Sequence, residues 1–175
     1  MLRFSGSYLA SARLPRVLQP TLNRLAAQTQ QSFSAVVLDG DEVVIVARSG
    51  VYGAPSRLPA HPTSTGRVLL AALSPAELPA WLKNRPLHRL TPQTITQVGP
   101  LRQVITKVRR DDYCLAVEEH ELGVHALAVP LRNLQGHTVA ALNVVASPKQ
   151  MDEGSLQRDM LPLLQDAARE LRGLL

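Results

Sequence analysis

The stretch from Asp112 to Ala146 constrains the fold more than any other part of the chain. It holds three apolar runs of strand length, separated by two short polar connections. The connection Asn133–Gly136 has Asn at its front and Gly at its back, so the last two runs are predicted to form an antiparallel hairpin. A charged loop closed by Gly123 joins the first two. The predicted strands are Cys114–Glu118, Ala126–Leu131 and Thr138–Val145.

The rest of the chain is predicted to supply a second hairpin and the helices that cover the sheet. Pro20 should kink or restart the first helix, and Pro162 should interrupt the last. The expected strands are Phe33–Leu38 and Glu42–Arg48, joined by Asp39-Gly40-Asp41; the expected helices are Leu14–Gln31, Ser64–Leu73, one opened by the capping box Ser74–Glu77, one from Gly99-Pro100 to about Asp112, and Asp152–Leu175; Gly50–Pro62 and Leu87–Gln97 are expected to be irregular. This order predicts an α+β fold, an antiparallel sheet covered by helices, rather than a doubly wound one.

Composition limits the function classes. A chain of 175 residues is most simply one domain, and 3% aromatic residues argues against a nucleic-acid platform built from stacked aromatics. The net charge of +5 is spread along the chain, with Arg109-Arg110 the densest basic spot, so we interpret it as a solvated surface. A single cysteine excludes an internal disulfide, and no run has the length of a membrane span or the apolar core of a signal peptide. We therefore expect a soluble, cytoplasmic protein.

Three stretches resemble the effector-binding domain of the IclR family of bacterial transcription regulators. They are LPRVLQPTLNRLA leading into VVLDGDEVVIVARS, then LPAHPTSTGRVLLAAL, then YCLAVEEHELGVHALAVPLRNLQGHTVAALNV. The match covers nearly the whole chain in order. The TSTGRVLLA segment is most similar to the branch that governs aromatic catabolism, the protocatechuate, 4-hydroxybenzoate and β-ketoadipate regulators.

The resemblance implies a GAF-like fold, a small organic acid as effector, and homodimers or tetramers. It also implies a winged helix-turn-helix domain ahead of the sensor, through which DNA would be bound. Residues 1–13 are too few for such a domain and resemble the end of its linker helix, so the effector-binding domain is expected to occupy residues 14–175. Tyr8 and Leu9 are apolar enough to dock on a neighbouring subunit.

The helix start at Ser64, Thr65 and Gly66 is the candidate anion site. The first N–H groups of a helix have no internal partner and the dipole is positive there, so a carboxylate is a natural guest. Gly66 would let a ligand approach closely. A plain capped helix, with Thr63 or Ser64 as cap, is the alternative. The resemblance favours the site, because these positions match the family's effector-contacting backbone.

The resemblance also places four strand residues around the effector: Ala116, Ala126, Asn143 and Val145. In family members that bind very small keto-acids, three of these positions are polar; here Ala116, Ala126 and Val145 are apolar and only Asn143 keeps a hydrogen-bonding side chain. Such a site should prefer a larger, more apolar acid. The alternative is that all four are core residues.

Two arginines, Arg48 and Arg67, are candidates to neutralise a ligand carboxylate, although each could be a surface residue. We predict no cofactor, no metal and no catalytic residue. The Glu118–Glu121 loop is expected to be solvated, since no second His or Cys stands at ligand spacing. Two other functions stay open at this point: a small enzyme using Cys114, with His120 or His125, or the acidic loop, and a direct nucleic-acid binder.

Overall fold

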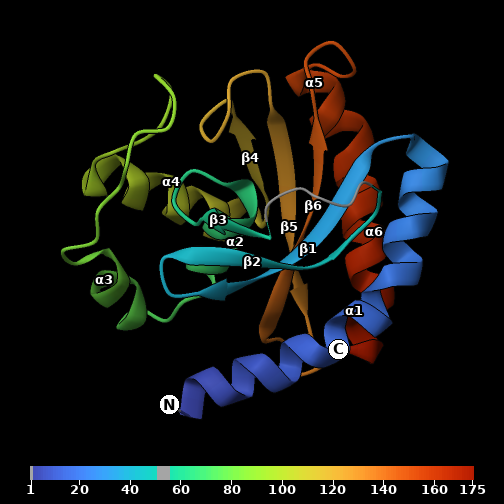
Figure 1. The fold of residues 1–175 in the computed structure, drawn as a ribbon, viewed down its shortest axis with the longest axis horizontal. Helices are drawn as coiled ribbons and strands as arrows, with labels where there is room; N and C mark the ends of the chain where they lie inside the picture. The colour runs from blue at the N-terminus through green and yellow to red at the C-terminus, as the bar shows by residue number, and fades with distance from the viewer. Residues whose placement is uncertain (1, 51–55) are drawn as a thin grey trace.

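The structure is a computed structural model that describes residues 2–50 and 56–175, and the side chains of residues 13–50 and 56–175. Figure 1 shows a central sheet with helices on both of its faces. In chain order the elements are α1 (Leu2–Thr29), β1 (Ser32–Asp39), β2 (Glu42–Arg48), β3 (Arg57–Pro59), α2 (Ser64–Ala71), α3 (Glu77–Leu82), α4 (Val98–Asp111), β4 (Cys114–Val117), β5 (His125–Arg132), β6 (Thr138–Ala146), α5 (Glu153–Ser155), the π-helix η1 (Leu156–Met160), α6 (Leu161–Leu171) and the 3-10 helix η2 (Arg172–Leu174).

The sheet confirms the predicted α+β class. Its six strands run in the order β3-β2-β1-β6-β5-β4, and every neighbouring pair is antiparallel. The two predicted hairpins are present: Asp39 pairs with Glu42 across the β1–β2 turn, and β5 pairs with β6 across the Asn133–Gly136 turn. Gly136 has a φ of +84° there, a value that glycine adopts without strain. The pairing of β1 with β6 joins the two hairpins into one sheet.

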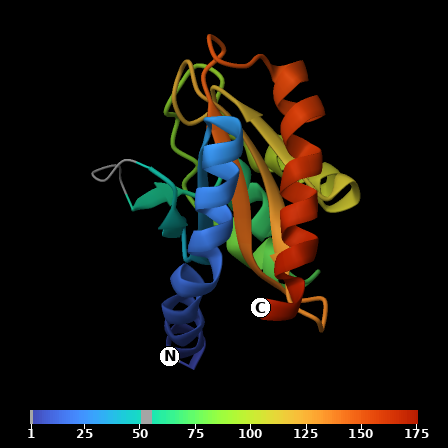
Figure 2. The same ribbon diagram turned by 90° about the vertical axis from the view of Figure 1, so that its right-hand side faces the viewer.

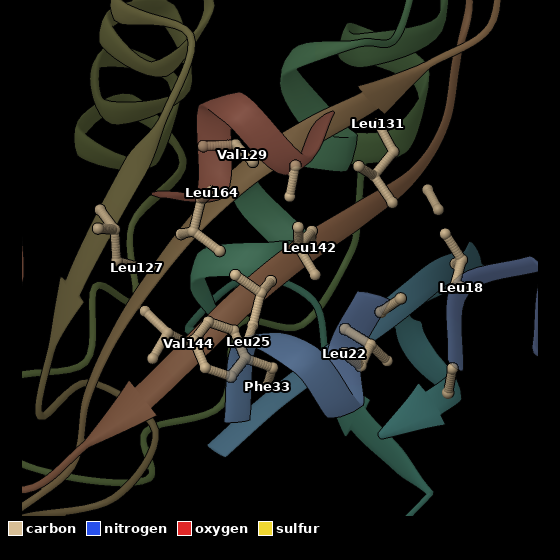
Figure 3. Packing of buried hydrophobic residues seen from close by; sticks show 14 of the residues in the cluster. Leu18, Leu22, Leu25, Phe33, Leu127, Val129, Leu131, Leu142, Val144 and Leu164 are labelled. Carbon is tan, nitrogen blue, oxygen red and sulfur yellow. The ribbon is translucent and has the colours of Figure 1, made fainter. Parts of the chain in front are cut away.

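Alternation along the strands divides the core into two layers. Figure 2 shows α1 and α6 side by side on one face of the sheet, and Arg24 on α1 donates to Glu170 on α6. The cluster beneath them is aliphatic apart from Phe33 and is drawn in Figure 3. Its labelled members are Leu18, Leu22, Leu25, Phe33, Leu127, Val129, Leu131, Leu142, Val144 and Leu164. The second cluster lies on the opposite face, where α2, α3 and α4 cover the sheet with Leu70, Trp81, Leu101 and Ile105.

Helix α1 is longer than predicted, and it continues through Pro20, where the sequence predicted a kink or a restart. It runs from Leu2 to Thr29, with Pro15 and Pro20 inside, and changes direction along its length in Figure 1. The two prolines lack the N–H that an internal helical turn uses. The side chains of Tyr8 and Leu9 lie outside the described residues, so their docking stays a prediction.

Within the described part of the chain no helix combines the length and the hydropathy needed to cross a membrane.

The closing helix is interrupted, as Pro162 predicted, but the break has a specific form. A π-helical segment, Leu156–Met160, separates α5 from α6, and α6 starts immediately before the proline. Leu156, Leu164 and Leu171 are buried against the sheet, whereas Leu174 is 57% exposed. The helix has already passed into η2 at that point, so the 3.6-residue periodicity no longer applies.

The segment predicted as a loop from Gly50 to Pro62 contains a short strand. β3 is three residues long and pairs with β2 at the sheet edge, where Leu58 lies opposite Val43. Residues 51–55 lie outside the described part. A strand of only three residues, one of them a proline, gives no recognisable pattern in the sequence. The capping box is present as predicted, since Ser74 N–H donates to Glu77 and Glu77 N–H donates to Ser74.

Candidate functional site

The first turn of α2 leaves polar groups without protein partners. Thr63 is the N-cap, and its Oγ1 accepts from the N–H of Gly66 at 3.2 Å. In the described residues the N–H groups of Ser64 and Thr65 have no protein acceptor. The hydroxyl of Ser64 is also buried with no hydrogen-bond partner, in a residue only 1% exposed. Three donors therefore converge at the positive end of a helix.

Gly66 has a packing role that was not predicted. Its N–H is used by Thr63, so it is not a donor for a ligand. A Cβ atom at position 66 would meet the backbone of Ala60, with the carbonyl carbon at 2.6 Å. The glycine therefore permits α2 to pack against residue 60. A ligand contact at Gly66 stays a prediction, and the donors of the proposed cradle without a protein acceptor are those of Ser64 and Thr65.

The predicted wall residues are brought together by strand pairing. Ala116, Ala126 and Val145 lie opposite one another on β4, β5 and β6, so their side chains share one face of the sheet. That face is the one covered by α2, because Ala128 and Ala141, which point the same way, pack in the cluster with Leu70. The exposed fraction of Ala116 is 5%, and Ala126 and Val145 are half-buried. On these three strands the row is lined by small and branched apolar groups, and on β1 it continues to Ser32.

Asn143 lies in the neighbouring row with a partner that sequence reasoning missed. The row continues from Asn143 to Ser34 on β1 and Arg48 on β2. The Ser34 hydroxyl donates to Oδ1 of Asn143 at 2.5 Å, which fixes the orientation of the amide. The amide nitrogen of Asn143 keeps two donors, with no acceptor for them among the described residues. Ser32 and Ser34 flank Phe33 in the sequence. This alternation of polar and apolar residues was the signal that could have placed the Ser34 hydroxyl on one face of the strand.

Arg48 and Arg67 have different surroundings. Arg48 shares the row of Asn143 and is half-buried, and a ligand contact through its guanidinium stays a prediction. Arg67 is neither a surface residue nor an uncompensated cation. It is 1% exposed, its Nε donates to the carbonyl of His61 at 2.9 Å, and its two terminal nitrogens donate to the two oxygens of Glu119, one of them at 2.6 Å. The sequence made Arg67 a candidate to bind a ligand carboxylate, whereas in the structure its guanidinium is paired with the carboxylate of Glu119.

The acidic loop is only partly solvated, which corrects a second expectation. Glu119 has a side chain that is 13% exposed, and its backbone carbonyl accepts from the Thr94 hydroxyl at 2.6 Å. Glu118 has a φ of +56°, and its carbonyl accepts from the Thr91 hydroxyl at 2.6 Å. The pair with Arg67 thus holds the first turn of α2 next to the end of β4, where Ala116 lies. In the described residues no group of three or more His, Cys, Asp or Glu could hold a metal ion.

The candidate nucleophile is buried. Burial raises the pKa of the Cys114 thiol to about 11, so the thiol is protonated near neutral pH. Cys114 on β4 pairs with Ala128 on β5, and among the described residues no histidine bonds its thiol. Burial also lowers the pKa of His61, whose Nε2 bonds the carbonyl of His88 at 2.9 Å. These surroundings do not support an activated thiol.

Comparison with known proteins identifies the family. The family model described as the C-terminal domain of the bacterial transcriptional regulator IclR matches residues 6–172. The chain belongs to the IclR family. Known IclR-type regulators include the "p-hydroxybenzoate hydroxylase transcriptional activator" of Acinetobacter baylyi, which is 48% identical over 99% of this chain and 69% of its own length. The "Pca operon regulatory protein" of the same organism is 44% identical over 100% of this chain and 67% of its own length.

A solved IclR-family structure supports the same fold. The inducer-binding domain of the PobR transcription factor from Acinetobacter, a double mutant in complex with 3-hydroxybenzoic acid, superimposes with a TM-score of 0.88. It is 47% identical and covers 93% of this chain and 99% of that one. The predicted resemblance to the aromatic-catabolism branch is therefore confirmed. Its relatives are named as regulators of transcription, which favours a sensor over an enzyme.

Proposed function

We propose that this IclR-family domain binds a small aromatic acid of the hydroxybenzoate type between the first turn of α2 and the sheet. The observation that carries the proposal is the buried hydroxyl of Ser64, which lacks a partner beside the N–H groups of Ser64 and Thr65. A buried polar group without a partner costs about 1–3 kcal/mol, and a carboxylate would accept from all three donors. The hydroxybenzoate complex of the PobR relative supports the choice of acid.

The sheet side of the site suits an aromatic ring. Ala116, Ala126 and Val145 offer a flat apolar row, and the donors on the amide of Asn143 lie in the next row. An acid with one further polar substituent would place its ring on the alanines and that substituent on Asn143. The absence of polar residues at the three apolar positions disfavours very small keto-acids.

The domain would act by shifting an equilibrium rather than by catalysis. Effector binding would change the population of conformations, or of homodimers and tetramers, and an attached winged-helix domain would convert the shift into a change in DNA binding. Residues 2–13 extend α1 without a break, and we propose that they lead toward such a domain. A regulator of transcription works where DNA is, so the proposal places the protein in the cytoplasm.

Calorimetry with 4-hydroxybenzoate, 3-hydroxybenzoate and benzoate tests the proposal. Ala126→Phe should fill the space for the ring and abolish binding. Asn143→Leu should remove one hydrogen bond, which at roughly 1–3 kcal/mol corresponds to about ten- to a hundredfold in affinity. Ala80→Phe on the exposed face of α3 and Asn23→Leu on the exposed face of α1 are the matched controls and should bind as the parent does. Normal binding by both site variants would move the site elsewhere.

Assembly and DNA binding need their own measurements. The apolar residues Leu18, Leu22 and Leu164 of α1 and α6 pack on the sheet of their own chain. Exposed apolar surface remains at Leu134 and Leu174, which are 70% and 57% exposed. Sedimentation at micromolar concentration with and without 4-hydroxybenzoate would measure the oligomer. A gel shift with an operator and a scrambled duplex would reveal any DNA binding by this domain alone.

A further inference from the structure

The pair formed by Arg67 and Glu119 cancels the charge of a fully buried guanidinium in the first turn of α2. Arg67 follows Ser64 by three positions, so the two residues lie on the same side of the helix, one turn apart. Its guanidinium contacts Glu119 with both terminal nitrogens, and the side chains of the two residues are 2% and 13% exposed. The anion-binding end of the site therefore contains a fixed negative charge as well as a fixed positive one.

Glu119 has little freedom to leave this position. One carboxylate oxygen also accepts from the N–H of Ile95 at 3.3 Å, and the backbone carbonyl of Glu119 is held by the hydroxyl of Thr94 at 2.6 Å. The Ser34 hydroxyl and the Asn143 amide carry no charge, and Arg48 stands at the end of their row on β2. A negative ligand group that approached Arg67 would have to displace Glu119 or remain beside it.

We propose that Glu119 is a specificity-determining residue that restricts the site to acids with a single negative charge. The inference rests on the proposed function. A singly charged acid is stabilised by the donors at Ser64 and Thr65. A second carboxylate would find the charge of Arg67 already neutralised by Glu119, and it would lose its hydration without a counter-charge, which costs far more in a poorly hydrated site than in water. The rest of the effector would therefore carry neutral groups, such as a hydroxyl, an amide or an ester.

A pair of ligands with the same shape and different charge tests this. Terephthalate carries two carboxylates, and 4-carbamoylbenzoate replaces one of them with a neutral amide of nearly the same size. Calorimetry on the parent protein should give at least tenfold tighter binding of 4-carbamoylbenzoate. In Glu119→Gln this ratio should fall at least tenfold, because Arg67 is no longer paired and can accept the second carboxylate. Glu121→Gln, on an exposed residue of the same loop, should leave the ratio unchanged.

The double variant R67Q/E119Q separates charge from structural support. It removes both charges and the ion pair, so its ratio should return to within about threefold of the parent value even if its stability is lower. A uniform loss of affinity for both ligands in Glu119→Gln would mean that Glu119 only supports the fold, and would overturn the proposal. If Glu119→Gln does not fold, equal binding of the two ligands by the parent overturns it, and a tenfold preference in the parent supports it.

The experiments distinguish a failure of the role proposed for Glu119 from a failure of the proposed function. Equal affinities for the two ligands, with 4-hydroxybenzoate binding abolished by Ala126→Phe, would overturn the role of Glu119 and leave the site intact. Normal binding of 4-hydroxybenzoate by Ala126→Phe would overturn the proposed function and the inference with it. If the parent binds neither ligand, admission of terephthalate by Glu119→Gln supports the proposal, and continued exclusion overturns it.

Discussion

Gly66 and Ala60 approach each other so closely that residue 66 has no room for a side chain. A Cβ atom on Gly66 would stand 2.6 Å from both the Cα and the carbonyl carbon of Ala60, and nearer still to its carbonyl oxygen. All three obstacles are backbone atoms, which cannot rotate away as a side chain would. The start of α2, which carries the unpaired donors of Ser64 and Thr65, can therefore pack against Ala60 only because residue 66 has no side chain.

We predict that Gly66→Ala destabilises the fold. Overpacking typically costs about 1–3 kcal/mol, and here the backbone itself would have to shift. The free energy of unfolding, measured by urea denaturation, should fall by at least that range. Gly99→Ala in α4 is the matched control, since a Cβ there would meet nothing within 4 Å, and its stability should be unchanged or slightly higher. A variant at 66 as stable as the parent would contradict the packing argument.

Ser64→Ala should separate binding from stability. The hydroxyl has no partner in the structure, so its loss should leave the urea midpoint unchanged or raise it. Affinity for 4-hydroxybenzoate should fall about tenfold or more, the value of a hydrogen bond to a charged group. Thr63→Ala, by contrast, removes the N-cap and should cost about 0.5–2 kcal/mol of stability. Unchanged affinity in Ser64→Ala would remove this hydroxyl from the site.

Cys114 should be slow to react with thiol reagents. Burial raises its pKa to about 11, so the thiolate fraction near pH 7.5 should be roughly a hundredfold below that of an ordinary cysteine. We expect labelling by a disulfide reagent at least that much slower in the native protein than in urea. Rapid native labelling would revive the possibility of an enzyme with a thiol nucleophile.

Stability should decline in mild acid because of His61. Burial lowers the pKa of this imidazole, so the folded state holds it neutral while the unfolded state takes up a proton more readily. Its contribution to stability is complete above about pH 6.5, the ordinary histidine value, and is lost as the pH falls toward the lower folded-state pKa. Urea midpoints between pH 7.5 and 5 should decrease, and His61→Gln should flatten the slope. His137→Gln, in the exposed β5–β6 turn, is the control.

Much of the fold was predictable because its signals are local. Apolar alternation marked β1, β2, β5 and β6, and the Asn133–Gly136 turn marked a hairpin. The row of Ala116, Ala126 and Val145 followed from family resemblance and strand pairing together. The strand β3 was not predicted, because three residues that include a proline are too few to show the apolar alternation of a strand. The packing of Gly66 against Ala60 was not predicted, because the crowding atoms belong to a loop whose path no pattern encodes.

The sequence by itself determined the antiparallel sheet, the helical stripes, a helix start capped by Thr63 or Ser64, and the family. Each depends on neighbours in the chain, where spacing and residue type dictate backbone conformation. Only the tertiary structure decided that Arg67 pairs with Glu119, 52 positions away, and that the Ser64 hydroxyl is buried without a partner. Such contacts arise when distant elements pack in one core, and charge compensation or its absence is then a property of the assembled site rather than of any segment.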